Sequence, residues 1–143
     1  MNRDTFSLLG DCTAGIELTV STIDGVLPNV KDQLLRRRLQ DGIRSHEALR
    51  DQSLALLQQG GAAAKPLPPM TKRLTQLQIT TRLALGRDDP TAADVVAHSC
   101  DRGVRELCRS RNRYTGADYE AQSLADRLIA CQENLSSTLR SFL

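Results

Sequence analysis

The sequence contains no tryptophan, and its 143 residues include only two tyrosines and two phenylalanines. Flat aromatic side chains stack on nucleobases, so their scarcity argues against a binding site for single-stranded nucleic acid. It argues against a sugar site for the same reason. A core with so few aromatic residues must consist of Leu, Ile, Val and Ala, and such side chains suit the packing of helix on helix.

The chain also lacks a long apolar run and a strong excess of one charge. No stretch approaches the roughly 18 apolar residues that a membrane-spanning helix needs. Nineteen basic and 17 acidic residues leave a formal net charge of +2. This balance does not predict a nucleic-acid or membrane partner from bulk electrostatics. No apolar segment follows residues 1–4, as a signal peptide would require, so we expect a cytoplasmic protein.

The four cysteines form no Cys-x-x-Cys pair, so zinc-ribbon or thioredoxin-like chemistry has no support. They are Cys12, Cys100, Cys108 and Cys131. We expect them to be reduced, unpaired and mostly buried as small apolar side chains, with Cys100 and Cys131 in the core. The length predicts a single domain, residues 1–143, which can bury a continuous core without metals or disulfides.

Five segments repeat apolar side chains at helical spacing, and none alternates as a strand does. Their repeating positions are Leu9, Ile16, Val20, Ile23 and Leu27; Leu35, Leu39, His46, Leu49 and Leu56; Met70, Leu74, Leu77 and Leu85; Val96, Cys100, Gly103 and Leu107; and Ala121, Leu124, Leu128, Cys131, Leu135 and Phe142. The sequence therefore predicts an all-α fold.

Helix-ending residues lie between these segments and suggest how the helices connect. Gly60 and Gly61 end the second segment, and Asp89 and Pro90 are typical of an N-cap and a first helical residue. Segments one, two, four and five are each roughly 23 to 30 residues long, or about 35 to 45 Å as helices. The third, about 16 residues and about 24 Å, would return the chain along the bundle, as the long crossover of ferritin-like bundles does. A plain five-helix array is the alternative.

Four stretches together resemble a family of bacterial ferritin-like four-helix bundles of unknown function. They are Ala14-Gly15-Ile16-Glu17, Asp89-Pro90-Thr91-Ala92-Ala93-Asp94-Val95-Val96, Cys100-Asp101-Arg102-Gly103-Val104-Arg105-Glu106-Leu107 and Leu135-Ser136-Ser137-Thr138-Leu139-Arg140-Ser141-Phe142-Leu143. The resemblance spans nearly the whole chain. It implies a short helical crossover between the second and third long helices, and it brings no known activity.

A di-iron centre is the first chemistry to test against such a fold. Ferritin-like iron sites take one Glu from each of two helices and a Glu-x-x-His pair from each of the other two. Glu17, His46 and Glu47 are the candidate metal ligands here. However, Arg50 stands three residues after Glu47, and the last helix contains no histidine. We therefore expect no cofactor and no catalytic residue, and we interpret these acids as surface residues flanking the core.

An arginine stripe is the second candidate. Arg102, Arg105, Arg109 and Arg113 recur at steps of three and four, which places them on one helix face. Arginine forks suit phosphate and carboxylate partners. The alternative interpretation is a solvated face, because 16 of the 19 basic residues are arginine.

These patterns favour a non-catalytic bundle that acts through protein contacts, including self-association as a homodimer. Two alternatives stay open: a ferritin-fold protein with a degenerate metal site, and an arginine-stripe binder of nucleic acid or acidic protein. We expect no membrane partner and no strong nucleic-acid binding. The sequence does not indicate a substrate or the identity of a partner.

Overall fold

The computed structural model describes residues 1–61 and 88–143, which form long α-helices and two short 3₁₀ turns without any strand. The helices are α1 (Arg3–Val26), α2 (Gln33–Gln59), α4 (Asp89–Arg113) and α5 (Tyr119–Leu139), and the turns are η1 (Leu27–Asn29) and η2 (Arg140–Phe142). The all-α prediction is confirmed. The third predicted segment, with Met70, Leu74, Leu77 and Leu85, lies outside the described residues, and so does the expected crossover helix.

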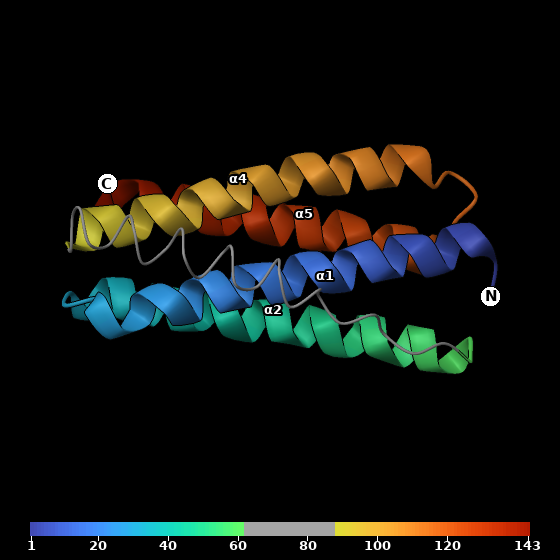
Figure 1. Ribbon diagram of the computed structural model, residues 1–143, viewed down its shortest axis with the longest axis horizontal. Helices are drawn as coiled ribbons and strands as arrows, with labels where there is room; N and C mark the ends of the chain where they lie inside the picture. Colours follow the sequence, from blue (N-terminus) through green and yellow to red (C-terminus); the bar gives the residue numbers. More distant parts are fainter. Residues whose placement is uncertain (62–87) are drawn as a thin grey trace.

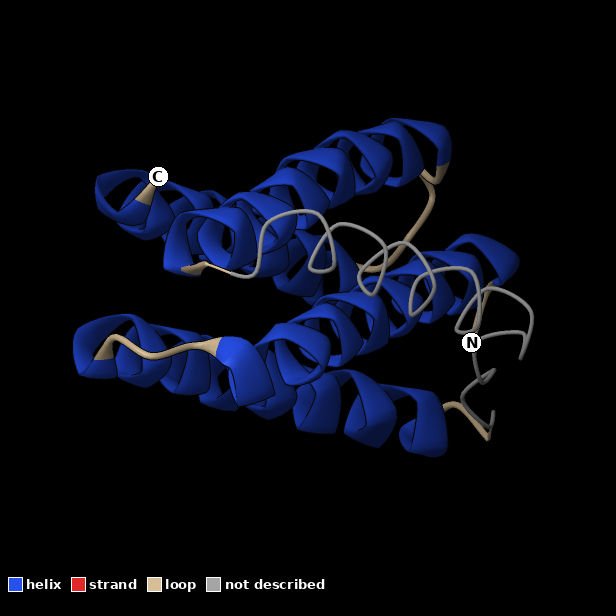
Figure 2. Cartoon of the chain, turned by 60° about the vertical axis from the view of Figure 1, so that its left-hand side comes forward, coloured by secondary structure: helices blue, strands red, loops and turns tan. Residues whose placement is uncertain are grey.

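The four described helices pack as an antiparallel bundle of two hairpins, α1 with α2 and α4 with α5 (Figures 1 and 2). α1 also packs beside α4, and α2 beside α5. Helix α2 ends and α4 begins at opposite ends of the bundle (Figure 1). The chain between them must therefore join the two ends. No helix among the described residues is long and apolar enough to cross a membrane.

Three of the helices begin with a polar side chain that satisfies a free backbone N–H. Asn2, Asp32 and Asp88 each accept a hydrogen bond from the backbone nitrogen three residues later, at 2.7–2.9 Å. Helix α2 ends at Gly60, and Gly61 follows with a φ of +74°, which favours glycine. This end of α2 was predicted correctly.

The predicted N-cap of α4 was wrong by one residue. Asp88 is the cap, while Asp89 and Pro90 lie within the first turn. The carboxylate of Asp89 instead accepts hydrogen bonds from the backbone nitrogens of Lys31 at 2.9 Å and Asp32 at 2.8 Å. Asp89 therefore ties the connection between α1 and α2 to the start of α4, a long-range role that local capping rules do not predict.

The core consists of two apolar clusters, one at each end of the bundle. The cluster near the α1–α2 turn contains Ile23, Val26, Val30, Leu35, Leu39, Ala92, Ala93, Val95, Val96, Ala97, Cys100, Leu135 and Leu139. The cluster near the α4–α5 turn contains Leu8, Leu9, Cys12, Ile16, Leu49, Leu57, Leu107, Ala117, Ala121, Leu124, Ala125 and Leu128. Between the two clusters lie the buried polar side chains of Thr19, His46 and Gln132.

The predicted apolar faces are buried or partly buried wherever the structure describes them. Two details differ. Leu57 is buried and Leu56 only partly so, because the buried positions of α2 continue from Leu49 through Ser53 to Leu57 in steps of four. The cysteines are unpaired as predicted, but Cys108 is exposed and Cys131 is only partly buried.

Candidate functional site

A polar layer lies at mid-bundle between the two apolar clusters, and each helix contributes one residue to it. These residues are Thr19 of α1, His46 of α2, Gly103 of α4 and Gln132 of α5, and we call them the central layer. His46 and Gln132 have no exposed surface, and Thr19 retains only 2%. The amide nitrogen of Gln132 donates to the hydroxyl oxygen of Thr19 at 3.1 Å. The centre of the bundle is thus polar but closed to solvent.

His46 is held in one tautomer by its own helix. Its Nδ1 lies 2.8 Å from the backbone oxygen of Gly42, and because a carbonyl only accepts, Nδ1 carries the proton. Nε2 is left as a buried acceptor with no hydrogen-bond partner among the described residues. Burial lowers the pKa of His46, and the bond to Gly42 opposes this only partly. The imidazole is therefore neutral at pH 7.

Helix α5 fills the space beside two glycines in the neighbouring helices. A methyl group at position 103 would overlap the amide oxygen of Gln132. A methyl group at position 42 would lie 3.0 Å from a terminal carbon of Leu135. Gln132 and Leu135 stand three residues apart on one face of α5. Both glycines therefore serve close packing, and side chains of α5 occupy the room that larger residues on α2 and α4 would need.

The structure does not bring the three candidate ligands Glu17, His46 and Glu47 together. Glu47 points outward, with 42% of its side chain exposed, and pairs with Arg50 at 3.1 Å. Glu17 is half-buried on α1, and its Oε2 has no hydrogen-bond partner among the described residues. Within residues 1–61 and 88–143, no three His, Cys, Asp or Glu side chains are placed to hold a metal ion.

The central layer does not fit a carboxylate-bridged pair of irons. Such a centre takes four inward Glu and two His from the four helices. The layer offers one imidazole, one hydroxyl, one amide and a glycine. His46 was predicted from the sequence to lie on an inward face, whereas Thr19 and Gln132 were not. The detectable signal was a glycine within each apolar face of α2 and α4, since glycine inside a helix costs stability unless packing needs it.

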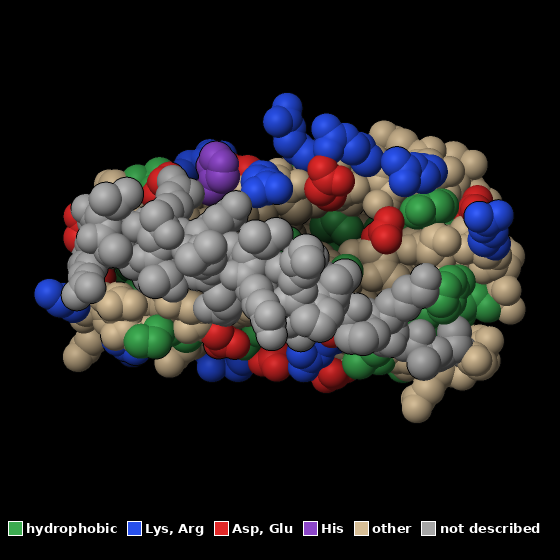
Figure 3. Space-filling view, viewed as in Figure 1, with side chains coloured by type: hydrophobic (Ala, Val, Ile, Leu, Met, Phe, Trp, Pro, Cys, Tyr) green, Lys and Arg blue, Asp and Glu red, His purple; other side chains and the backbone are tan. Residues whose placement is uncertain are grey.

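The four stripe arginines lie on the outer face of α4, as their spacing predicts. Arg102, Arg105, Arg109 and Arg113 are all exposed, and a row of basic side chains follows the upper edge of the molecule over α4 (Figure 3). Arg109 forms an ion pair with Glu106. The other three have no acidic partner among the described residues, so most of the positive charge on this face is not neutralised.

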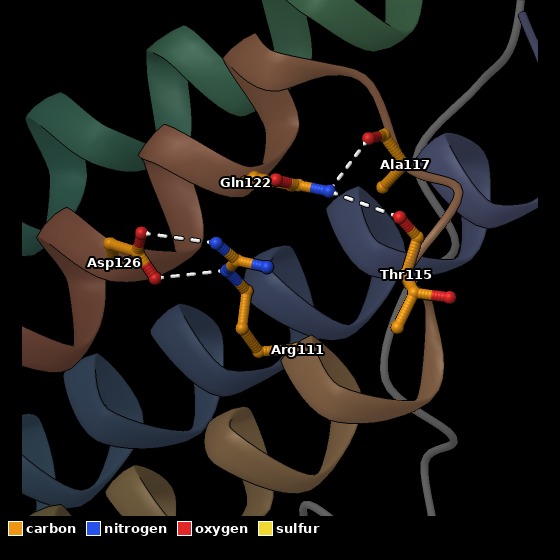
Figure 4. A network of polar contacts seen from close by, with 5 residues as sticks. All are labelled: Arg111, Thr115, Ala117, Gln122 and Asp126. Carbon is orange, nitrogen blue, oxygen red and sulfur yellow. Dashed lines mark hydrogen bonds and ion pairs between the residues drawn. The ribbon is translucent and has the colours of Figure 1, made fainter.

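A polar network fastens the α4–α5 connection (Figure 4). Arg111 donates to both carboxylate oxygens of Asp126, at 3.0 and 3.4 Å. The amide nitrogen of Gln122 donates to the backbone oxygens of Ala117 at 2.9 Å and Thr115 at 3.3 Å. A shallow groove of about 270 Å³ lies beside them, lined by Arg111, Tyr119, Gln122, Ser123, Asp126, Arg127 and Ala130. Because its polar groups already bond one another, we assign this network a structural role.

No protein-family model, curated protein or solved structure matches the chain. What the structure shows is a four-helix all-α bundle. The likeness to ferritin-like bundles rests on the sequence stretches alone.

Proposed function

We propose that the chain is a ferritin-like four-helix bundle without catalytic activity that acts through contacts with other proteins. The composition of the central layer carries this proposal. Ferritin-like enzymes place their metal ligands on inward positions of all four helices. In this chain the central layer consists of Thr19, His46, Gly103 and Gln132: Gln132 hydrogen-bonds Thr19 and packs against Gly103, while His46 is bound to Gly42 of its own helix.

The order of the helices supports the ferritin-like part of the proposal. Two antiparallel hairpins are joined by one connection between opposite ends of the bundle (Figure 1). A single long crossover of this kind distinguishes ferritin-like bundles from simple up-and-down bundles. The sequence resemblance points to the same arrangement.

Protein contact follows as the function by fold-level analogy. In a bundle whose centre is closed, with Gln132 packed against Gly103, the outer surface remains for function. We expect self-association as a homodimer, in the cytoplasm. The exposed large apolar side chains of the described residues, Met1, Leu34, Tyr119 and Leu143, are scattered over different elements. Because these apolar side chains are scattered, a dimer interface on the described surface would be mostly polar and sensitive to salt.

A second candidate function is a single-ion site, favoured by one observation. His46 Nε2, Glu17 Oε2 and Gln132 Oε1 are buried acceptors without a hydrogen-bond partner among the described residues. Such atoms are costly unless something binds them. A cation is one ligand that buried acceptors attract.

Titration of metal-free protein with Fe²⁺ and Mn²⁺ under anaerobic conditions, followed by calorimetry, separates the two functions. The proposal predicts no binding tighter than about 100 μM, equivalent to about 5.5 kcal/mol. Stoichiometric binding below about 1 μM that disappears in His46→Ala would favour the ion site. Sedimentation velocity at low and high salt tests the dimer, and a monomer under all conditions would exclude self-association but not a different protein partner.

A further inference from the structure

We propose that the outer face of α4 binds an acidic α-helix of a partner protein. The inference rests on the proposed function, because it names the partner of a bundle that acts through protein contacts. We call the surface formed by Arg102, Arg105, Arg109 and Arg113 the arginine face. Its place on the bundle, its charge and its spacing each support the assignment.

The arginine face is turned away from the core. With 100° per residue, its four positions fall within a sector of about 80°. Cys100 and Leu107, which are buried in the two clusters, lie on the opposite side of the same helix. The four arginines span about 16 Å along the axis, at 1.5 Å per residue. They therefore form a straight row that is fixed to a rigid frame.

The charge of this row is mostly unopposed. Glu106 neutralises Arg109, and the guanidinium of Arg113 lies 5.9 Å from the ring centre of Tyr114. Arg102, Arg105 and Arg113 form no ion pair within residues 1–61 and 88–143. His98 is exposed four residues before Arg102 and extends the same face by one turn. Because few acids among the described residues neutralise this row of cations, its guanidinium groups are free to bind an external anion.

The spacing of the row matches a second helix. Carboxylates at steps of three, four and four on a partner helix repeat along its axis as the arginines do. Guanidinium groups bind carboxylates through two parallel hydrogen bonds, which gives each contact a preferred geometry. One exposed ion pair contributes little by itself. Several pairs in register are needed, so the partner must carry its acids in this pattern.

Nucleic acid fits the surface less well. The whole chain has a net charge of only +2 and a pI near 8.5, whereas nucleic-acid-binding domains are usually more basic. Glu106 is 70% exposed between Arg105 and Arg109, and it would repel a continuous row of phosphates. The four residues of the face are arginines, none of which offers an aromatic ring on which a base could stack, and the ring of nearby Tyr114 lies against Arg113. A helix with separate carboxylates can place a neutral residue opposite Glu106.

A fluorescein-labelled, alanine-based helical peptide with four Glu at steps of three, four and four is the direct probe. A scrambled peptide with the same four Glu spread around the helix, a DNA duplex and a single-stranded RNA are the comparisons. Binding to the full-length chain is measured by fluorescence anisotropy at 50 and 200 mM salt. We expect the patterned peptide to bind at least about fivefold more tightly than the scrambled one, and more weakly at the higher salt.

Charge reversal locates the binding surface. Arg102→Glu with Arg105→Glu changes the face, and Arg37→Glu with Arg140→Glu makes the same charge change at exposed residues on α2 and η2. Both double variants take the net charge from +2 to −2. The face variant should bind the patterned peptide at least about tenfold more weakly and should gain binding to a peptide with Lys in place of Glu. The matched variant should lose several-fold less affinity for the patterned peptide. Circular dichroism should confirm that both double variants are folded.

Four results would overturn the inference. Equal binding of patterned and scrambled peptides, or equal weakening in both double variants, would show that binding depends on net charge and not on the arginine face. Tighter binding of DNA or RNA that is lost in the face variant would make nucleic acid the partner. Absence of any binding would remove the arginine face as a docking site. None of these results decides whether the bundle centre holds a metal, so the proposed function is tested separately.

Discussion

His46 places an ionisable side chain in the middle of the core without an acidic partner. Its Nδ1 is bound to Gly42, and its ring is fully buried. Burial lowers its pKa in the folded chain, whereas an imidazole in the unfolded chain titrates near 6.5. Below about pH 6.5 the unfolded chain therefore binds more protons than the folded chain. Folding stability should fall as the pH decreases, by up to about 1.4 kcal/mol per pH unit.

Urea unfolding at pH 7.0 and pH 5.5 measures this dependence. The variant His46→Gln should lose less stability between the two pH values than the unmodified chain, because its buried side chain takes up no proton. His98→Gln, which removes the exposed imidazole, is the matched control and should retain the original dependence. The same loss in His46→Gln as in the unmodified chain would mean that His46 is not the titrating group.

The four cysteines differ in access and in acidity. Burial raises the pKa of Cys12 and of Cys100 to about 12, and it also raises the pKa of Cys131. Because the thiolate is the reactive form, alkylation of the native protein at pH 8 should modify the exposed Cys108 first. Cys131 should follow slowly, and Cys12 and Cys100 should react only after unfolding. Mass spectrometry against reaction time gives this order, and early modification of Cys100 would contradict its burial.

At the scale of the helices, the contact between α4 and α5 depends on Gly103. A methyl group there would overlap the amide oxygen of Gln132. Gly103→Ala should therefore destabilise the fold by about 1–3 kcal/mol, although alanine is the better helix former. Gly15→Ala is the control, since its nearest neighbour is a terminal carbon of Leu107 at 3.9 Å. It should be neutral or stabilising by up to about 1 kcal/mol.

Thermal unfolding of the two glycine variants and of Gly103→Ala with Gln132→Ala completes this test. Truncating Gln132 removes the overlapping atoms, so the two changes together should cost less than their sum. Equal stability of Gly103→Ala and Gly15→Ala would show that the two helices approach less closely than the structure indicates.

The described helices were predictable because their apolar spacing and end signals are local. Leu124, Leu128 and Leu135 recur at helical steps and are buried, and Gly60 and Gly61 end α2 where expected. Gln132 could not be predicted in the same way. An amide is usually a surface residue, and only the packed bundle brings Thr19 and Gly103 around it. The N-cap of α4 was predicted at Asp89 instead of Asp88 because both adjacent aspartates are residues that N-caps prefer.

The candidate site was predictable only in part, for the same physical reason. Helical spacing placed His46 in the core and the four arginines on one exposed face of α4. It could not decide whether Glu17 and Glu47 would meet, because the rotation of each helix in the bundle is set by long-range packing. The structure points Glu47 outward to Arg50, and no group of three His, Cys, Asp or Glu side chains forms a metal site within residues 1–61 and 88–143.

For the whole molecule, the ends of the bundle and its centre differ in polarity. The frame is a regular bundle with an apolar cluster at each end. The centre is a closed layer of buried polar side chains, in which Gln132 of α5 packs against Gly103 of α4 and donates a hydrogen bond to Thr19 of α1. A carboxylate-bridged pair of irons at this layer would require Glu ligands that its four residues do not provide. We therefore propose that function lies on the outside of the bundle, with the arginine face as a binding surface.

The metal content of the protein purified from iron-supplemented cells tests this account most directly. We predict well under one iron or manganese per chain by elemental analysis. A tightly bound ion stabilises the folded state by mass action, so we also predict a melting temperature that barely changes with a chelator. Stoichiometric iron or manganese, lost together with stability in Glu17→Ala or His46→Ala, would contradict the account and make the bundle a metal protein.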